Sequence, residues 1–254
     1  MRCIWCQKER SVWSLEHPIP ESLGNSEITL SEGVCRKCNN SFGGLDAALL
    51  RPFELLTVSL GIPRKGGRGP TIDGWRGMKS RWVRGKPELF LNAGPGDVVT
   101  PMGVLKPASK GSGISSITMP DDPVMGQSVN IGIQHDLRFD RRFVRGIYKC
   151  GFELLLLQIG LDLAHDPAFD RVRSFCLEDD GDLSALVIFR EFTRSGTSSY
   201  FMEPHLPSSA ACSFELFGME FVCDFSPQQK YLDRIESEGA GAVGATAIHR
   251  IPYR

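Results

Sequence analysis

Apolar residues recur at helical spacing in two stretches of the chain. Between Leu45 and Leu60 they follow one another at steps of three and four residues, which predicts a helix with a kink or restart at Pro52. The second stretch follows Asp140, a residue suited to cap a helix, and predicts a helix over 141–163. Its first turns carry basic side chains that we assign either to a basic surface or to solvent, namely Arg141, Arg142, Arg145 and Lys149.

Apolar and polar residues alternate elsewhere, which is the pattern of strands. The alternation over 184–192 and 212–225 predicts strands, and the second stretch continues on both sides of Gly218 as a hairpin would. Residues 92–134 are rich in Gly, Pro, Ser and Thr, and they predict short strands joined by long loops.

The N-terminal residues predict a smaller unit. Strands are expected at 12–15 and 28–34, on either side of a loop over 18–25, and a helix is expected to start near Cys35. The chain is therefore predicted to be α+β, with a small ββα unit followed by a larger mixed part.

Composition and charge narrow the choice of function only slightly. The chain has 254 residues, of which 41% are hydrophobic and 23% charged, as is typical of globular proteins. The formal net charge of −1 excludes a uniformly basic nucleic-acid-binding surface but allows a local basic patch. No apolar run reaches the length of about 18 residues that a membrane-spanning helix needs. The first ten residues also lack the apolar core of a secretory signal, so we expect a cytoplasmic protein without a membrane partner.

Four of the eight cysteines form two close pairs near the N-terminus. In a reducing compartment such cysteines are thiols or metal ligands rather than disulfides. Two C-x-x-C pairs can place four thiolates tetrahedrally around one zinc ion, whereas a redox C-x-x-C motif needs no second pair. We therefore predict one structural Zn²⁺ held by Cys3, Cys6, Cys35 and Cys38. The isolated cysteines are predicted to be small buried residues: Cys150, Cys176, Cys212 and Cys223.

Chemically active residues lie next to these pairs. Glu16 and His17 precede a proline-rich turn, and Asn39 directly follows the last cysteine of the second pair. Carboxylate and amide oxygens are hard ligands that suit Mg²⁺ or Mn²⁺, and a neutral imidazole can take a proton from water near pH 7. The alternative is a surface Glu-His pair without chemistry.

The combined pattern resembles the HNH endonuclease family, the zinc-knuckle branch of the ββα-metal nucleases. Members of one branch of this family carry segments close to LEHPIPESLG (15–24) and CNNSFG (38–43). The resemblance implies that His17 is the general base that activates water and that Glu16 and Asn39 ligate one catalytic Mg²⁺ or Mn²⁺. It also implies a nucleic-acid substrate, with DNA favoured over RNA, and a setting such as bacterial antiviral defence or a mobile element.

The sequence departs from the family pattern at one position. The family's central Asn, which pins the hairpin loop, is expected near position 32, where this chain has Glu32. Asn25 is a candidate substitute. Glu21 is assigned either to a partner of the site or to an exposed loop, and Asn40 to a phosphate contact or, preferably, a supporting role.

A basic segment follows the N-terminal unit. From Ile62 to Lys86 there are eight basic residues and one acidic residue, and Trp75 and Trp82 lie among them. Beside a nuclease motif we interpret this segment as a nucleic-acid contact; the alternative is a solvated glycine-rich loop with structural tryptophans. The residues assigned to nucleic acid are Arg64, Lys65, Arg68, Arg76, Lys79, Arg81 and Arg84.

These observations predict three segments. Residues 1–60 are expected to form the zinc-bound HNH finger, 61–91 the basic connecting segment, and 92–254 an α+β accessory domain that could contact a protein partner or a second copy of the chain. The predicted activity is metal-dependent hydrolysis of phosphodiester bonds. The alternative is a non-catalytic zinc module that binds nucleic acid or a partner protein.

Overall fold

The computed structural model describes residues 1–25, 27–54, 57, 62–63, 140–189, 211–243 and 245–251, together with the backbone of strands between 78 and 135. By their contacts the residues fall into two compact units, one made of 1–51 and 139–254 and the other of 52–138. The N-terminal residues 1–50, called the finger below, therefore share a unit with the C-terminal part of the chain, although the two are far apart in sequence.

The finger is mixed in structure, with short helices and few regular strand pairs. The predicted strands are reduced to isolated bridges that join Trp13 to Cys35 and Glu16 to Leu30. A helix does begin beside Cys35, as predicted, and the kink expected at Pro52 lies in a 3₁₀ turn. The helical elements of the finger are η1 (Glu21–Leu23), α1 (Arg36–Ser41) and α2 (Gly43–Leu50), and the 3₁₀ turn η2 (Arg51–Phe53) follows directly.

Helix α4 (Arg141–Ile159) runs through the middle of this unit. The Asp140 side chain caps its start by accepting a hydrogen bond of 2.9 Å from the Phe143 backbone N–H, as the sequence predicted. The helix ends four residues before the predicted end, because Gly160 leaves the helical conformation with φ 100°. Almost every side chain from Phe143 to Leu156 is buried, so α4 is a core helix and not a surface helix.

Short helices follow α4 before the chain enters the sheet. The turn that opens at Pro167 is 3₁₀, and an α-helix follows from Asp170. These elements are η3 (Leu161–His165), η4 (Pro167–Phe169) and α5 (Asp170–Glu178).

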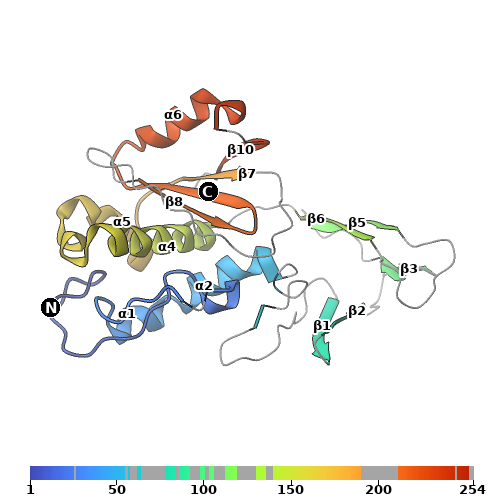
Figure 1. Cartoon of the computed structure of the whole chain (residues 1–254), viewed down its shortest axis with the longest axis horizontal. Coiled ribbons are helices and arrows are strands. Elements are labelled where there is room, and N and C mark those ends of the chain that lie inside the picture. Colours follow the sequence, from blue (N-terminus) through green and yellow to red (C-terminus); the bar gives the residue numbers. More distant parts are fainter. Residues whose placement is uncertain are drawn as a thin grey trace. The chain divides into compact units, whose positions relative to one another are not determined.

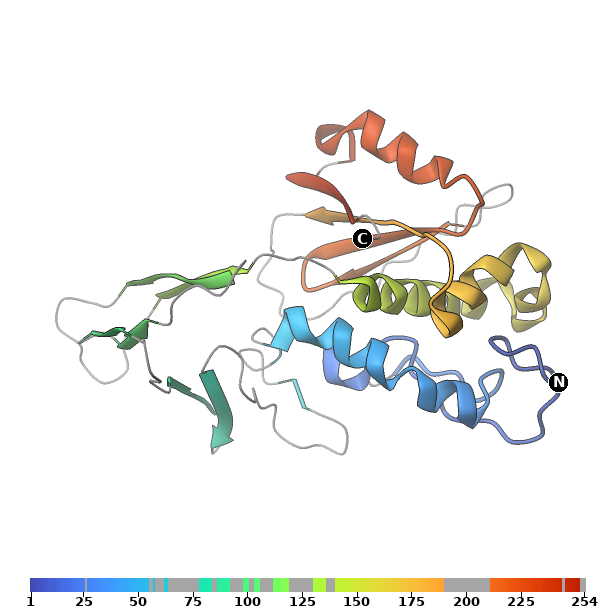
Figure 2. The same cartoon turned by 180° about the vertical axis from the view of Figure 1, so that it is seen from behind.

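A four-stranded antiparallel sheet lies on the other side of α4 (Figures 1 and 2). Its order is β10-β7-β9-β8, and the predicted hairpin is present, with Phe217 and Gly218 both at positive φ in the turn. Type I′ turns need this conformation at both central residues. The strands are β7 (Ala185–Phe189), β8 (Ala211–Leu216), β9 (Met219–Asp224) and β10 (Ala247–Ile251).

The far face of the sheet is covered by α6 (Lys230–Glu238) (Figure 1). Leu232 and Ile235 of this helix pack on Leu186, Ile188 and Val222 of the sheet. The 3₁₀ turn η5 (Ala240–Val243) then leads into β10. Within this unit the order of layers is thus finger, α4, sheet and α6.

Between residues 78 and 135 the described part of the second unit forms antiparallel strand pairs, in agreement with the short strands predicted for 92–134. Of the described helices, none has the length and the apolar character that crossing a membrane requires. The strands are β1 (Met78–Val83), β2 (Lys86–Leu91), β3 (Val98–Thr100), β4 (Gly103–Leu105), β5 (Ser112–Thr118) and β6 (Asn130–His135), paired in that order.

Candidate functional site

The predicted zinc ligands come together in the finger. The sulfur atoms of Cys3, Cys6, Cys35 and Cys38 all lie within 4.8 Å of one another, and those of Cys6 and Cys35 are 3.9 Å apart. Four thiolates at the usual Zn–S distance of about 2.3 Å form a tetrahedron with edges of about 3.8 Å. The four cysteines therefore fit a single structural Zn²⁺.

The hydrogen bond between Cys3 and Cys38 favours the thiolate at Cys3 and raises the pKa of Cys38. Hydrogen bonding from Cys38 outweighs burial and lowers the pKa of Cys3 to about 4, and the backbone N–H of Cys35 also donates to its sulfur at 3.4 Å. Among the described residues, this is the only group of three or more His, Cys, Asp or Glu side chains arranged to hold a metal ion. The four isolated cysteines are buried, as predicted, and burial raises the pKa of each: Cys150, Cys176, Cys212 and Cys223.

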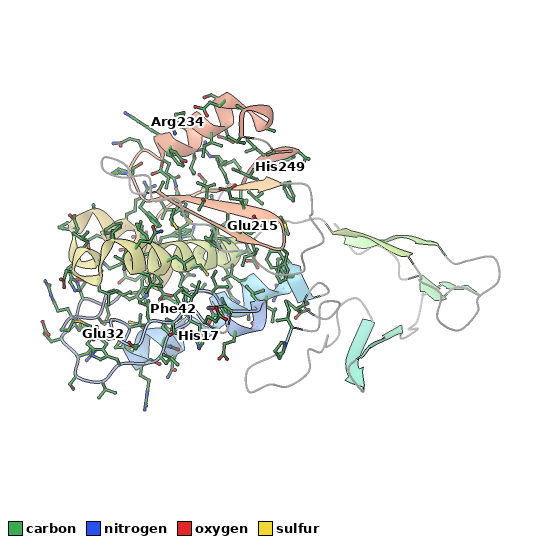
Figure 3. The ribbon with its side chains drawn as sticks, in the orientation of Figure 1. His17, Glu32, Phe42, Glu215, Arg234 and His249 are labelled. Atoms are coloured by element: carbon green, nitrogen blue, oxygen red, sulfur yellow. The ribbon has the colours of Figure 1, made fainter. Side chains whose placement is uncertain are left out.

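The loop after His17 is pinned by Asn25, which is 2% exposed. Its Nδ2 donates to the carbonyls of Ile19 at 2.8 Å and Ile28 at 2.9 Å, and its Oδ1 accepts from the backbone N–H groups of Glu27 and Ile28. Glu32, in contrast, is exposed on the finger (Figure 3). In this chain Asn25 thus closes the loop, the role that the resemblance places near position 32.

Asn25→Ala is expected to lower the free energy of unfolding by about 2–3 kcal/mol, because several buried backbone groups lose their partner at once. Glu32→Ala is the matched control and should change stability by less than about 0.5 kcal/mol, as exposed substitutions usually do. Chemical denaturation of both variants measures the difference. Equal effects of the two substitutions would show that Asn25 does not pin the loop.

His17 lies in the finger below α4, close to Phe42 (Figure 3). Its side chain is 20% exposed, and its Nε2 is 3.3 Å from Oε1 of Glu21, the first residue of η1. Within the described part of the chain, His17 Nδ1 is buried and has no hydrogen-bond partner. The structure therefore brings Glu21, the weaker of the sequence candidates, to the imidazole.

Asn39 lies in α1 and reaches back toward the segment that carries Glu16 and His17. Its Nδ2 donates to the carbonyl of Leu15 at 3.2 Å. This bond fixes the plane of the amide, so Oδ1 is the atom left to face a ligand. Asn40, next in the chain, is exposed.

Glu16 is buried, with 4% of its surface exposed, and it forms an ion pair with Lys149 of α4. The sequence assigned Lys149 to a basic surface or to solvent, and this assignment is wrong: the side chain is fully buried. Its Nζ also donates to the carbonyl of His17 at 3.1 Å and lies 3.4 Å from Glu153 and 3.5 Å from Asp46. Burial alone would lower the pKa of Lys149, but the surrounding carboxylates raise it well above its usual value.

Glu153 links α4 to the first cysteine pair. Its Oε1 accepts a hydrogen bond of 2.8 Å from Nε1 of Trp5, the residue between Cys3 and Cys6. Burial raises the pKa of Glu153 well above the usual carboxyl range, and the attraction to Lys149 only partly opposes this shift. Burial also raises the pKa of Glu16, again against Lys149. For both carboxyl groups, burial favours the protonated form and Lys149 favours the ionised form.

The raised pKa of Glu153 predicts a pH-dependent difference between wild type and Glu153→Gln. Above the usual carboxyl pKa of about 4.3, the folded wild type keeps a proton that the unfolded chain releases, so its stability falls as pH rises. The glutamine variant has no such proton. Its stability relative to wild type should therefore rise by up to about 1.4 kcal/mol per pH unit until the raised pKa is passed. Denaturation of both proteins from pH 5 to 8 measures this difference, and a constant or falling difference would contradict it.

The residues assigned to nucleic-acid binding are only partly described. Arg64, Lys65, Arg68, Arg76 and Arg84 lie outside the described residues, and Lys79 and Arg81 are described only by their place in the backbone of β1. At the start of α4, Arg141 and Arg145 both pair with Asp179, so these two are ion-paired within the protein.

Sequence reasoning missed the three residues that join α4 to the finger, namely Trp5, Lys149 and Glu153. One signal could have indicated them. The apolar residues of 143–156 cover about two thirds of the helix circumference, which is more than the single apolar stripe of a surface helix. Lys149 and Glu153 stand one turn apart within this stretch, and charges inside a buried helix need partners from another part of the fold.

Comparison with protein families gives one match, between residues 3–54 and the family described as HNH endonuclease. Comparisons with curated proteins and with solved structures give no significant match. The matched segment contains both cysteine pairs and the residues Glu16, His17 and Asn39. It ends before the basic segment and before α4. Residues 3–54 of this chain therefore form an HNH endonuclease domain.

Proposed function

We propose that this protein is a metal-dependent endonuclease that hydrolyses phosphodiester bonds in DNA, with His17 as the general base. The observation that carries the proposal is the state of the imidazole. One ring nitrogen faces Glu21 at 3.3 Å, while the other is buried and has no hydrogen-bond partner among the described residues. The lone pair of that second nitrogen is therefore not engaged by the described part of the protein, and it can accept a proton from a water molecule.

The Glu21 carboxylate can only accept a hydrogen bond when ionised, so it selects the tautomer of His17 that carries its proton on Nε2. The lone pair then lies on Nδ1, the atom that can take a proton from water. A base needs this arrangement, in which one nitrogen is held by a partner and the other receives the proton. Glu21 thus orients the imidazole in the proposed reaction.

Glu16 and Asn39 are the proposed ligands of one Mg²⁺ or Mn²⁺. Their donor atoms are a carboxylate oxygen and an amide oxygen, which suit a hard divalent cation that keeps several waters. The amide of Asn39 is already fixed through Leu15, and the Glu16 carboxylate is fixed through Lys149. When bound, such an ion would stabilise negative charge on the phosphate and on the leaving oxygen.

The burial of Glu16 against Lys149 favours a second candidate, a zinc module that binds nucleic acid without cutting it. The pair with Lys149 and the burial of Glu16 are also what a purely structural carboxylate would show. The two candidates differ in one measurable property, because only the nuclease changes the covalent structure of its ligand.

The test is plasmid nicking by the full chain with Mg²⁺ or Mn²⁺, followed by the same assay with EDTA and with single-stranded RNA as substrate. We expect nicks that require the divalent ion and that are lost in Glu16→Gln. The control is Glu9→Gln, a change at an exposed residue of the same finger. DNA retention without nicking under every divalent ion would support the second candidate. Roles in antiviral defence, and contacts of residues 92–254 with a partner or second copy, stay predictions.

A further inference from the structure

We propose that Lys149, supplied by helix α4 of the C-terminal part, is a positioning residue for the nuclease site of the finger. The inference rests on the proposed function and names a residue outside the matched HNH segment. In this view the finger does not carry a complete site by itself, because one of the groups that hold the site in place comes from more than a hundred residues farther along the chain.

Lys149 contacts the segment of the finger that carries Glu16 and His17. Its ammonium group is paired with the Glu16 carboxylate and donates to the main-chain carbonyl of His17 at 3.1 Å. One group thus holds both the proposed metal ligand and the backbone of the proposed base. Lys149 is fully buried, so it cannot contact a phosphate, and its effect must pass through Glu16 and His17.

The next turn of the same helix contacts the finger through Glu153. Glu153 follows Lys149 by four residues, and its carboxylate accepts from the Trp5 indole at 2.8 Å. The Trp5 ring packs edge-on against Phe42 at 4.8 Å and Phe152 at 5.0 Å between ring centroids. One turn of α4 therefore contacts two parts of the finger: the first cysteine pair, through Trp5, and the Glu16–His17 segment.

Helix α4 is itself packed closely on both sides. One turn before Lys149, a Cβ atom on Gly146 would lie 2.6 Å from Leu49 of α2. On the sheet side, a Cβ atom on Gly151 would lie 2.9 Å from the sulfur of Cys223. Side chains packed this closely against the backbone of α4 leave little room for the helix to shift. The position of the Lys149 ammonium is therefore set by the finger and the sheet together.

The experiment compares Mn²⁺ binding to the full-length wild type, Lys149→Met and Arg145→Met, measured by electron paramagnetic resonance, with zinc content and melting temperature recorded for each. Arg145 lies one turn earlier on α4 and binds Asp179 and the carbonyl of Cys176 instead of the finger. Glu16→Gln identifies the Mn²⁺ signal that belongs to the site. Residues that orient metal ligands typically change affinity by about 10–100-fold, and we expect a loss of this size in Lys149→Met alone, with a parallel loss of nicking.

A lysine that only stabilises the fold would give another result. In that case Lys149→Met with one zinc per chain and a folded melting transition would bind Mn²⁺ as tightly as wild type, or more tightly, and this would overturn the proposal. If Lys149→Met does not fold, Lys149→Gln takes its place, because glutamine keeps a donor for the His17 carbonyl without the charge. Mn²⁺ affinity equal to wild type in that variant would overturn the proposal equally.

The failure of the proposed function looks different from the failure of this inference. If wild type neither nicks DNA with any divalent ion nor loses Mn²⁺ on Glu16→Gln, the nuclease assignment itself is wrong. If wild type nicks, and Glu16→Gln abolishes nicking while a folded Lys149→Met does not, only the role of Lys149 is wrong.

Discussion

His17→Ala is expected to lower the rate of plasmid nicking by about 10²–10⁴-fold, the usual contribution of a positioned general base. Nε2 of this imidazole lies 3.3 Å from Glu21. Nδ1 is buried and has no hydrogen-bond partner among the described residues. Alanine removes the proton acceptor but leaves the backbone contact from Lys149, which is made by the carbonyl of residue 17. Zinc content and melting temperature should therefore stay close to those of wild type.

The matched control for this prediction is His165→Ala. His165 belongs to η3, and its Nδ1 lies 2.9 Å from Oε1 of Gln7, outside the cluster of Glu16, Glu21 and Lys149. Nicking by this variant should remain at the wild-type rate. Single-turnover nicking with excess enzyme separates the chemical step from DNA binding. If His17→Ala and wild type nick at the same rate, then His17 is not the base, and the activity arises from another site or from a contaminant.

The four-cysteine cluster could be predicted from the sequence because its signal is local, and the catalytic candidates rest on a signal of the same kind. Each cysteine pair is a four-residue motif, and Glu16, His17 and Asn39 lie at fixed short distances from these pairs. The hairpin around Gly218 is local in the same sense, since its strands and its turn are adjacent in the chain. The cysteine cluster and the hairpin form as these local patterns predicted, whereas the catalytic roles of Glu16, His17 and Asn39 stay predictions.

The strands of the finger were predicted less well. Alternation over 12–15 and 28–34 indicated a regular ladder, but the structure has only single bridges from Trp13 and Glu16. Hydrogen bonds from Asn25 and packing on α4 hold these segments instead. Small metal-bound units often lack regular ladders, because the metal and the surrounding core supply the restraint that a sheet would otherwise give.

The role of α4 could not be predicted, because it depends on contacts between residues far apart in sequence. Lys149 pairs with Glu16 and Glu153 binds Trp5, in each case across more than 130 residues. Read from composition, Lys149 is one more basic residue at the start of a helix. Its burial becomes visible only when the finger occupies one side of α4 and the sheet the other (Figures 1 and 2). Through the contacts of α4, the C-terminal part therefore contributes to the structure of the finger.

Removal of the zinc ion is expected to unfold the finger and abolish nicking. In small zinc-binding peptides the metal contributes about 10–16 kcal/mol at pH 7, which is as large as the whole stability of a typical domain, about 5–15 kcal/mol. Cys38→Ser should therefore lose the zinc, and hydrogen exchange should show loss of protection over 1–50. The sheet should keep more of its protection, because its core against α6, with Leu232 and Ile235, contains no residue of the finger.

The control for thiol removal is Cys212→Ala, which alters a buried cysteine of β8 outside the zinc cluster. This variant should keep one zinc per chain and a protected finger, even if its melting temperature falls. The contrast separates loss of metal from loss of packing, since both substitutions remove one buried sulfur. One zinc per chain in Cys38→Ser, together with a protected finger, would refute the four-thiolate site. If the finger unfolds on zinc loss, Glu16 is also released from Lys149. Zinc loss and Lys149→Met should therefore both weaken the Mn²⁺ signal. Only zinc loss should expose the backbone of the finger to hydrogen exchange.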